Sequence, residues 1–179
     1  MNKKVLIIST SLRTGSNSEA LADEFAKGAV IGGHQAEKIS LADKQINFCR
    51  GCLACQKTKR CVIRDDADTI SQKMLNADVL AFATPIYYYE MCGQMKTLLD
   101  RANPIFAADY KFREVYLLTT AADTDENTPS RAVGGLEGWL ECFPKARLAG
   151  TVFGGGVTDV GDIKNNPSLT KAYEMGKKI

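Results

Sequence analysis

Four of the six cysteines in this chain fall within 13 residues, which makes this the densest group of potential metal ligands in the sequence. They follow the pattern Cys-x2-Cys-x2-Cys-x5-Cys, a spacing at which thiolates can bind an iron–sulfur cluster or zinc. Two Cys-x2-Cys units that share one cysteine suit a cuboidal cluster better than a tetrahedral zinc ion. The four candidate ligands are Cys49, Cys52, Cys55 and Cys61.

The surroundings of these cysteines favour metal or redox chemistry over a disulfide framework, because the chain shows no secretory features. Residues 44–64 contain six basic side chains and no acidic one, and three aspartates follow within the next four positions. The remaining cysteines, Cys92 and Cys142, are interpreted as packing residues. The one histidine, His34, is interpreted as a solvated loop residue, which disfavours a histidine-centred hydrolase.

A second polar group lies at residues 9–18, between a predicted strand and a predicted helix. It contains four serines, two threonines, an asparagine and an arginine. Amides at a helix N-terminus attract anions, hydroxyls donate to phosphate oxygens, and Arg13 can pair with phosphate charge. With one glycine and no lysine, the loop suits a phosphate monoester better than the di- or triphosphate of a P-loop. Alternatively, the loop only caps the helix, through Ser16 or Ser18.

Three consecutive tyrosines follow another predicted strand, in residues 84–91. Pro85 stiffens this segment, and tyrosine rings offer apolar faces with polar tips. A rigid wall of this kind, with backbone amides at its edge, suits a flat heteroaromatic ligand. The alternative is that one or two of the tyrosines pack against neighbouring helices.

Both segments are positioned by an alternation of apolar strands and helices. Strands are predicted at residues 5–9, 35–40, 79–83, 115–119 and 149–153, and Asp66 or Asp68 is the expected cap of the helix after the cysteines. The fold class is therefore α/β, a flavodoxin-like three-layer sandwich with a five-stranded parallel sheet in the order 2-1-3-4-5. A ligand would bind at the carboxyl ends of the strands. Residues 1–179 are expected to form a single domain with a cysteine-rich loop at about 44–64.

With these segments in place, the chain resembles the NADPH-dependent FMN reductase family of flavodoxin-like proteins and, within it, the iron–sulfur flavoproteins. Three segments carry the resemblance, and together they make up about a quarter of the chain. They are residues 9–20 (STSLRTGSNSEA), 48–66 (FCRGCLACQKTKRCVIRDD) and 84–101 (TPIYYYEMCGQMKTLLDR).

The resemblance implies FMN as cofactor. The residues that would hold its phosphate are Ser11, Arg13, Ser16, Asn17 and Ser18. Those that would lie along its ring are Pro85, Ile86, Tyr87 and Tyr88. By position after the fourth strand, Thr120 and Ala121 would border the ring, although the segment Ala121-Ala122-Asp123 lacks the glycine expected there.

The cysteine spacing resembles the [4Fe-4S] motif of the iron–sulfur flavoproteins, and three interpretations of it stay open. The cysteines bind such a cluster, they bind zinc, or they are small buried residues in a clusterless loop that covers the flavin edge. In the first case, the nearby cations would offset the cluster's charge and attract an acidic electron donor such as ferredoxin.

Composition excludes several other classes of function. The net charge of +2 gives no electrostatic reason to expect a nucleic-acid partner. No apolar run approaches the roughly 20 residues of a membrane-spanning helix, and the apolar run after Lys4 is shorter than that of a signal peptide. We therefore expect a cytoplasmic protein without a membrane or nucleic-acid partner.

The expected function is FMN-dependent oxidoreduction, in which NAD(P)H reduces a quinone, a flavin or another small acceptor. FMN itself carries such chemistry, so no catalytic side chain is expected. One alternative is an iron–sulfur flavoprotein that passes electrons from ferredoxin through a [4Fe-4S] cluster to FMN. Others are a non-catalytic flavin and thiol redox sensor and a nucleotide-binding domain without flavin. A homodimer or homotetramer is expected, because flavin sites in small domains often lie between subunits.

Overall fold

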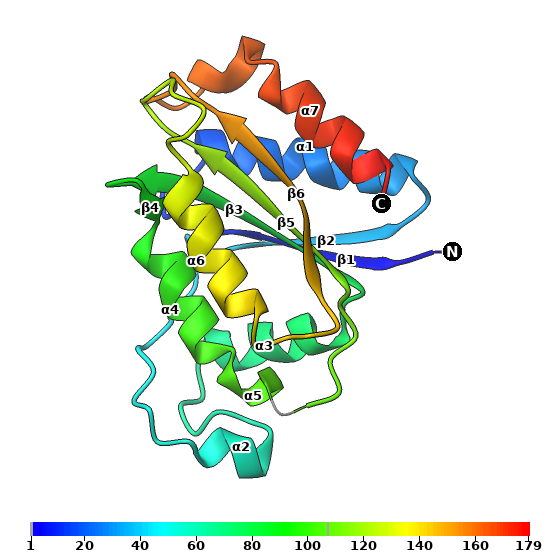
Figure 1. The fold of residues 1–179 in the computed structure, drawn as a ribbon, viewed down its shortest axis with the longest axis vertical. Helices are drawn as coiled ribbons and strands as arrows, with labels where there is room; N and C mark the ends of the chain where they lie inside the picture. Colours follow the sequence, from blue (N-terminus) through cyan, green and yellow to red (C-terminus); the bar gives the residue numbers. More distant parts are fainter. Residues whose placement is uncertain (1, 107) are drawn as a thin grey trace.

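A parallel five-stranded sheet forms the centre of the computed structural model, which describes residues 2–106 and 108–179 (Figure 1). The strand order is β2-β1-β3-β5-β6, and every neighbouring pair on this path is parallel. The predicted order 2-1-3-4-5 is confirmed, because the fourth and fifth predicted strands are β5 and β6. The strand bounds are β1 (Lys4–Ser9), β2 (Gln35–Ser40), β3 (Val79–Tyr87), β5 (Glu114–Thr120) and β6 (Arg147–Gly154).

Helices cover both faces of this sheet, as the continuous apolar strands predict. Successive side chains of a strand point to opposite faces, so Val5 and Ile7 of β1 enter one core while Leu6 and Ile8 enter the other. One face is covered by α1 (Asn17–Ile31) and α7 (Ser168–Lys177). The other is covered by α3 (Asp66–Asn76), α4 (Gly93–Arg101), α5 (Asn103–Phe106) and α6 (Ser130–Leu140).

The tyrosine segment is a β-hairpin rather than a loop. The strand β3 was expected to end near Ala83 but continues to Tyr87, and the chain then turns back into β4 (Glu90–Met91). Both turn residues have positive φ, 51° at Tyr88 and 66° at Tyr89. Two-residue hairpin turns need such angles, and glycine or asparagine at these positions is the sequence signal for them. Because tyrosines stand there instead, the sequence did not predict the turn.

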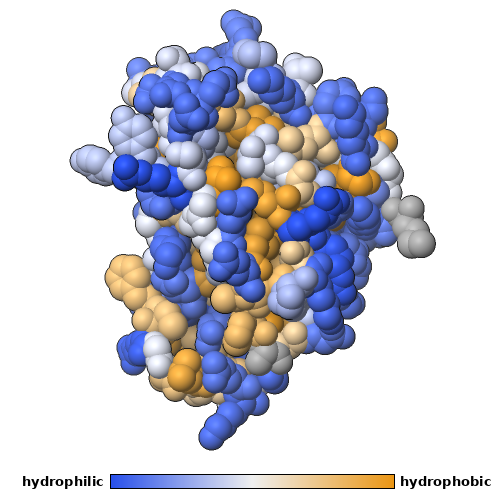
Figure 2. Space-filling model, viewed as in Figure 1, coloured by the Kyte–Doolittle hydropathy of each residue, from blue (hydrophilic) through white to orange (hydrophobic). Residues whose placement is uncertain are grey.

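The cysteine segment lies between β2 and α3 and is mostly irregular. It contains one short helix, α2 (Ala54–Thr58), which packs near α5, away from the carboxyl ends of β3, β5 and β6 (Figure 1). Leu53 and Val62 are exposed on it, and the lower part of the same view in space-filling form shows apolar surface there (Figure 2). The helical part of the segment therefore lies away from the edge of the sheet at which the ligand is expected, whereas Ile46 and Phe48 line a cavity with Leu12 of the loop after β1.

The helix ends differ in part from expectation. Ser16 caps α1, with its hydroxyl accepting a hydrogen bond from the Glu19 amide, as one of the two alternatives predicted. The N-cap position of α3 is Asp65 rather than Asp66 or Asp68, and its carboxylate makes no capping bond. Among the residues described, no helix has both the length and the apolar character needed to cross a membrane.

Candidate functional site

A cavity of about 210 Å³ opens at the carboxyl ends of the strands. It is bordered by the loops that follow β1, β5 and β6 and by the end of β3, which parallel topology brings to one edge of the sheet. Ten of the eleven residues predicted from the sequence to bind FMN line it. They are Ser11, Arg13, Ser16, Asn17, Ser18, Pro85, Ile86, Tyr87, Thr120 and Ala121.

The polar end of this cavity is the start of α1. Ser11, Ser16 and Ser18 are all buried there, and the hydroxyls of Ser16 and Ser18 lie 3.3 Å apart. The first amides of a helix carry partial positive charge, and buried hydroxyls beside them add donors. This donor set fits the phosphate of a monoester.

Two of the predicted phosphate ligands also form hydrogen bonds with the loop that follows β6. The Arg13 Nη1 donates to the Thr158 carbonyl at 2.7 Å. The Asn17 side chain donates to the Asp159 carbonyl at 2.9 Å and accepts from the Ile163 amide at 3.3 Å. The Asn17 amide group therefore positions the loop after β6, and Arg13 keeps its remaining guanidinium donors for a ligand.

The loop after β6 supplies wall residues that the sequence did not single out. Val157 and Thr158 line the cavity, as does Ala122 from the loop after β5. A signal for the first two was present, because residues 154–156 are three consecutive glycines at the end of the fifth predicted strand. Such a run permits close backbone approach at the ligand edge of the sheet.

The other end of the cavity is an apolar wall. Ile86 is buried, whereas Tyr87 is 56% exposed and stands at the mouth. Thr120 and Ala121 are buried on the opposite side, at the end of β5. The structure places Tyr88 elsewhere, since its side chain is 98% exposed at the hairpin tip and does not line the cavity. The end of β3 and the end of β5 are neighbours in the sheet, so together they give this end of the cavity its wall.

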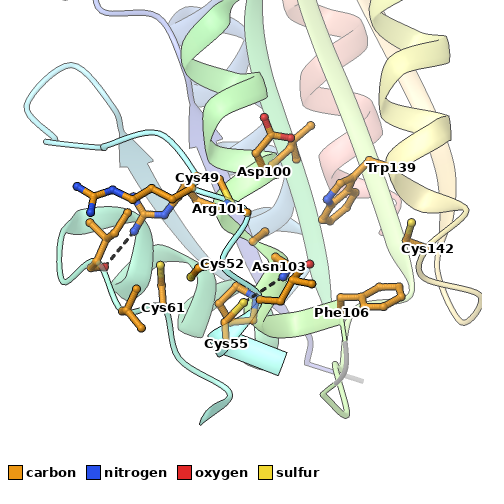
Figure 3. Close-up of a pocket in the computed structure, with 18 of the residues that line it drawn as sticks. Cys49, Cys52, Cys55, Cys61, Asp100, Arg101, Asn103, Phe106, Trp139 and Cys142 are labelled. Atoms are coloured by element: carbon orange, nitrogen blue, oxygen red, sulfur yellow. Dashed lines mark hydrogen bonds between the residues drawn. The ribbon is translucent and has the colours of Figure 1, made fainter. Parts of the chain in front are cut away.

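A second cavity, of about 440 Å³, lies at the far end of α4 (Figure 3). Cys49, Cys52, Cys55 and Cys61 all line it, and Cys142 lies on its opposite wall beside Phe106 and Trp139. No residue is shared between this cavity and the one at the strand ends. Within the described part of the chain, no three histidine, cysteine or acidic side chains are gathered closely enough to hold a metal ion.

Two of the four cysteine sulfurs accept hydrogen bonds from N–H donors. The Asn103 Nδ2 donates to the Cys55 Sγ at 3.0 Å, and the Gly51 amide donates to the Cys49 Sγ at 3.5 Å. The Arg101 Nε is buried and has no hydrogen-bond partner among the described residues. Four thiols, amide donors and an unpaired guanidinium nitrogen have the chemistry that an anionic, thiolate-bound group such as an iron–sulfur cluster requires of its surroundings.

Arg101 closes the cysteine loop from the end of α4. Its side chain is fully buried, and its two terminal nitrogens each lie 2.7 Å from a carboxylate oxygen of Asp65. The same nitrogens donate to the carbonyls of Asn47 and Ile63, at 2.6 and 3.0 Å. One guanidinium thus joins both ends of the loop.

The interpretation of Cys142 as a packing residue does not hold, because it is exposed and lines the cavity.

These contacts shift the acidity of both partners. Burial by itself would raise the pKa of Asp65, but hydrogen bonds from Arg101 and Asn47 lower it to about 2. Burial would likewise lower the pKa of Arg101, whereas the Asp65 carboxylate and the Cys61 thiol raise it. The pair is therefore fully ionised at neutral pH.

A second buried carboxylate, that of Asp68, holds the cysteine loop near Cys61. The Arg60 Nη2 lies 2.5 Å and the Arg64 Nη1 3.0 Å from its Oδ2, and the Cys61 amide donates to its Oδ1 at 3.1 Å. Arg60 above all lowers the pKa of Asp68, followed by Arg64 and the Cys61 amide. Two of the six cations of this segment are thus engaged in holding it.

Comparison with known proteins identifies the family to which the chain belongs. The family model described as NADPH-dependent FMN reductase matches residues 3–152. This chain belongs to that family. An iron–sulfur flavoprotein of Archaeoglobus fulgidus is 29% identical over 98% of this chain and 78% of its own length, and one of Methanosarcina thermophila is 25% identical over 98% and 93%. An iron–sulfur flavoprotein of Methanocaldococcus jannaschii is 39% identical, but the match covers 57% of this chain and only 53% of that protein.

Solved structures share the fold of this flavin reductase family member. The Trp repressor binding protein of Bacillus subtilis has a TM-score of 0.69 and 24% identity, covering 96% of this chain and 97% of that one. An azoreductase of Bacillus anthracis has a TM-score of 0.72 and 16% identity, covering both chains completely. At these identities the likeness establishes the flavodoxin-like fold alone.

Replacing Asp65 by asparagine removes the partner of a buried charge, so we expect the free energy of unfolding at pH 7 to fall by roughly 3 kcal/mol. The folded pKa of Asp65 lies below its unfolded value, so its contribution is complete above about pH 4 and is lost as the pH falls towards 2. Urea unfolding across this range should show the difference between Asp65→Asn and the unsubstituted protein shrinking with falling pH.

The matched control is Asp100→Asn, which breaks the solvent-exposed ion pair between Asp100 and Lys96 on α4. Exposed pairs contribute little, so this variant should lose less than about 1 kcal/mol. A loss of the same size in both variants would contradict the structural role assigned to Asp65.

Proposed function

We propose that this protein is an FMN-dependent oxidoreductase of the iron–sulfur flavoprotein type. FMN would occupy the cavity at the strand ends, and a [4Fe-4S] cluster would be held by Cys49, Cys52, Cys55 and Cys61. The observation that carries the proposal is that these four thiols line one cavity that also presents unpaired or sulfur-directed N–H donors. The names of the relatives from three archaea support it.

In this proposal, Ser11, Ser16 and Ser18 bind the phosphate of FMN at the start of α1, and Arg13 adds a charged donor. Asn17 contributes indirectly, by fixing the loop that carries Thr158. When bound, FMN supplies the exchange of one or two electrons with a substrate. Ile86 and Tyr87 of the hairpin support the ring, and the exposed position of Tyr87 leaves the mouth open to a small acceptor.

The electron donor is proposed to be an acidic protein of the ferredoxin class. Arg50 and Lys57 are exposed on the cysteine loop, whereas two other cations of the loop are paired with Asp68. An exposed basic surface beside the cluster would attract an acidic donor and align it. The exposed Leu53 and Val62 on the same loop would add apolar contact.

A second candidate function is the NAD(P)H-dependent reduction of a quinone, a flavin or another small acceptor. The open mouth beside Tyr87 favours it, since a nicotinamide ring could stack there on FMN. In this case the cysteine site would not be needed for turnover. We also propose a homodimer or homotetramer, in which the exposed tip of the hairpin would be covered.

The phosphate site predicts a difference between two ligands. Arg13→Met removes a charge-assisted contact worth roughly 1.5–3 kcal/mol, so we expect FMN to bind about 10- to 150-fold more weakly. Riboflavin lacks the phosphate and should bind the variant and the unsubstituted protein alike in a fluorescence titration. Equal losses for both ligands would show that Arg13 acts through its contact with Thr158 and not on phosphate.

The cluster predicts the iron content of cysteine variants. After anaerobic purification or reconstitution with iron and sulfide, alanine at any one of the four proposed ligands should abolish stoichiometric iron and the cluster's visible absorbance. Cys142→Ala is the matched control, because this cysteine lines the same cavity and should leave the iron content unchanged. Full iron loading of the Cys61→Ala variant would contradict the proposed ligand set.

The two candidate functions differ in their electron donor. Under anaerobic conditions, a reduced ferredoxin should bleach the flavin absorbance of the cluster-loaded protein, and Cys61→Ala should slow this reaction at least 10-fold. NADPH alone should reduce the flavin only slowly. Rapid NADPH turnover that is unaffected by Cys61→Ala would favour the second candidate.

A further inference from the structure

We infer that Asn103 and Arg101 donate hydrogen bonds to sulfur in the cysteine site and set the reduction potential of the cluster it holds. The inference rests on the proposed function, because it concerns the group proposed to bind there. Neither residue belongs to the cysteine loop. Asn103 begins α5 and Arg101 ends α4, so both donors come from the framework against which the loop packs (Figure 3).

Asn103 makes a direct contact with one of the four thiols. Its Nδ2 lies 3.0 Å from the Cys55 Sγ, and Cys55 is buried. Water therefore competes little for this sulfur. An asparagine amide is a neutral donor whose hydrogen bond persists when the sulfur carries negative charge.

Arg101 offers a donor that has no acceptor of its own. Its terminal nitrogens already hold Asp65 in a bidentate pair and also donate to the carbonyls of Asn47 and Ile63. These bonds fix the plane of the guanidinium, so its Nε cannot turn to another acceptor. This atom is buried, and the side chain lines the cavity that the four cysteines also line.

A buried donor without an acceptor is unfavourable, and native structures rarely contain one without a reason. The cavity beside Arg101 holds the four sulfurs, which are the acceptors that such a donor lacks. When a cluster is reduced, negative charge increases on its sulfurs. Donors directed at them stabilise the reduced form and raise the reduction potential.

The inference is tested by potentiometric titration of the cluster in the anaerobically prepared protein. Asn103→Leu removes the amide donor at similar side-chain volume, and Arg101→Lys keeps the positive charge but removes Nε. Both variants should shift the midpoint potential to more negative values at unchanged iron content. Asn76→Leu, at an exposed asparagine at the end of α3, is the control and should leave the potential unchanged.

A second readout separates a sulfur contact from a purely structural role. Exchange into deuterium oxide shifts the Fe–S stretching bands of a sulfur that accepts a hydrogen bond, and Asn103→Leu should reduce this shift in the resonance Raman spectrum. Because Arg101→Lys can weaken the fold, the inference is decided on Asn103→Leu. Unchanged potential and unchanged bands in a cluster-loaded Asn103→Leu protein would overturn it, whereas failure of the unsubstituted protein to take up iron and sulfide would overturn the proposed function as well.

Discussion

Because the five long strands of this protein all run in the same direction, every loop that follows a strand emerges at one edge of the sheet. That constraint places the serine-rich start of α1 opposite the tyrosine hairpin, although about 70 residues of chain separate them. It also brings the end of β5 and the loop after β6 to the same cavity, where they supply Thr120 and Thr158. The cavity proposed to bind FMN therefore follows from the direction of the strands, and each loop contributes only its local chemistry.

The cysteine loop depends on a different interaction, the buried pair of Arg101 and Asp65. Taking both charges out of water is costly, and the cost is offset only because each charge is paired and also hydrogen-bonded to the loop's backbone. Such an arrangement tolerates few alternatives, so it specifies where the two ends of the loop lie. The loop between them needs little regular structure, and its one short helix has five residues.

The separation of the two cavities follows from the length and direction of α4. The residue before this helix, Cys92, packs against Thr10 in the loop after β1, and the helix ends at Arg101 beside the cysteines. A nine-residue α-helix is about 13 Å long, so the two sites lie at opposite ends of one rigid element. Any electron that passes between them within one chain has to cross this length of packed protein.

The sequence alone determined the alternation of strands and helices, the two faces of each strand, the polar loop before α1 and the cysteine spacing. Each of these features is set by residues that lie close together in the chain. Only the tertiary structure decided which contacts Asn17 and Arg101 make and that the tyrosine segment forms a hairpin. The bonds of Arg101 join residues 36 to 54 positions apart, and no local pattern encodes such a pairing. The positive φ angles of Tyr88 and Tyr89 likewise contradict their local preference, because the pairing of β3 with β4 imposes the turn.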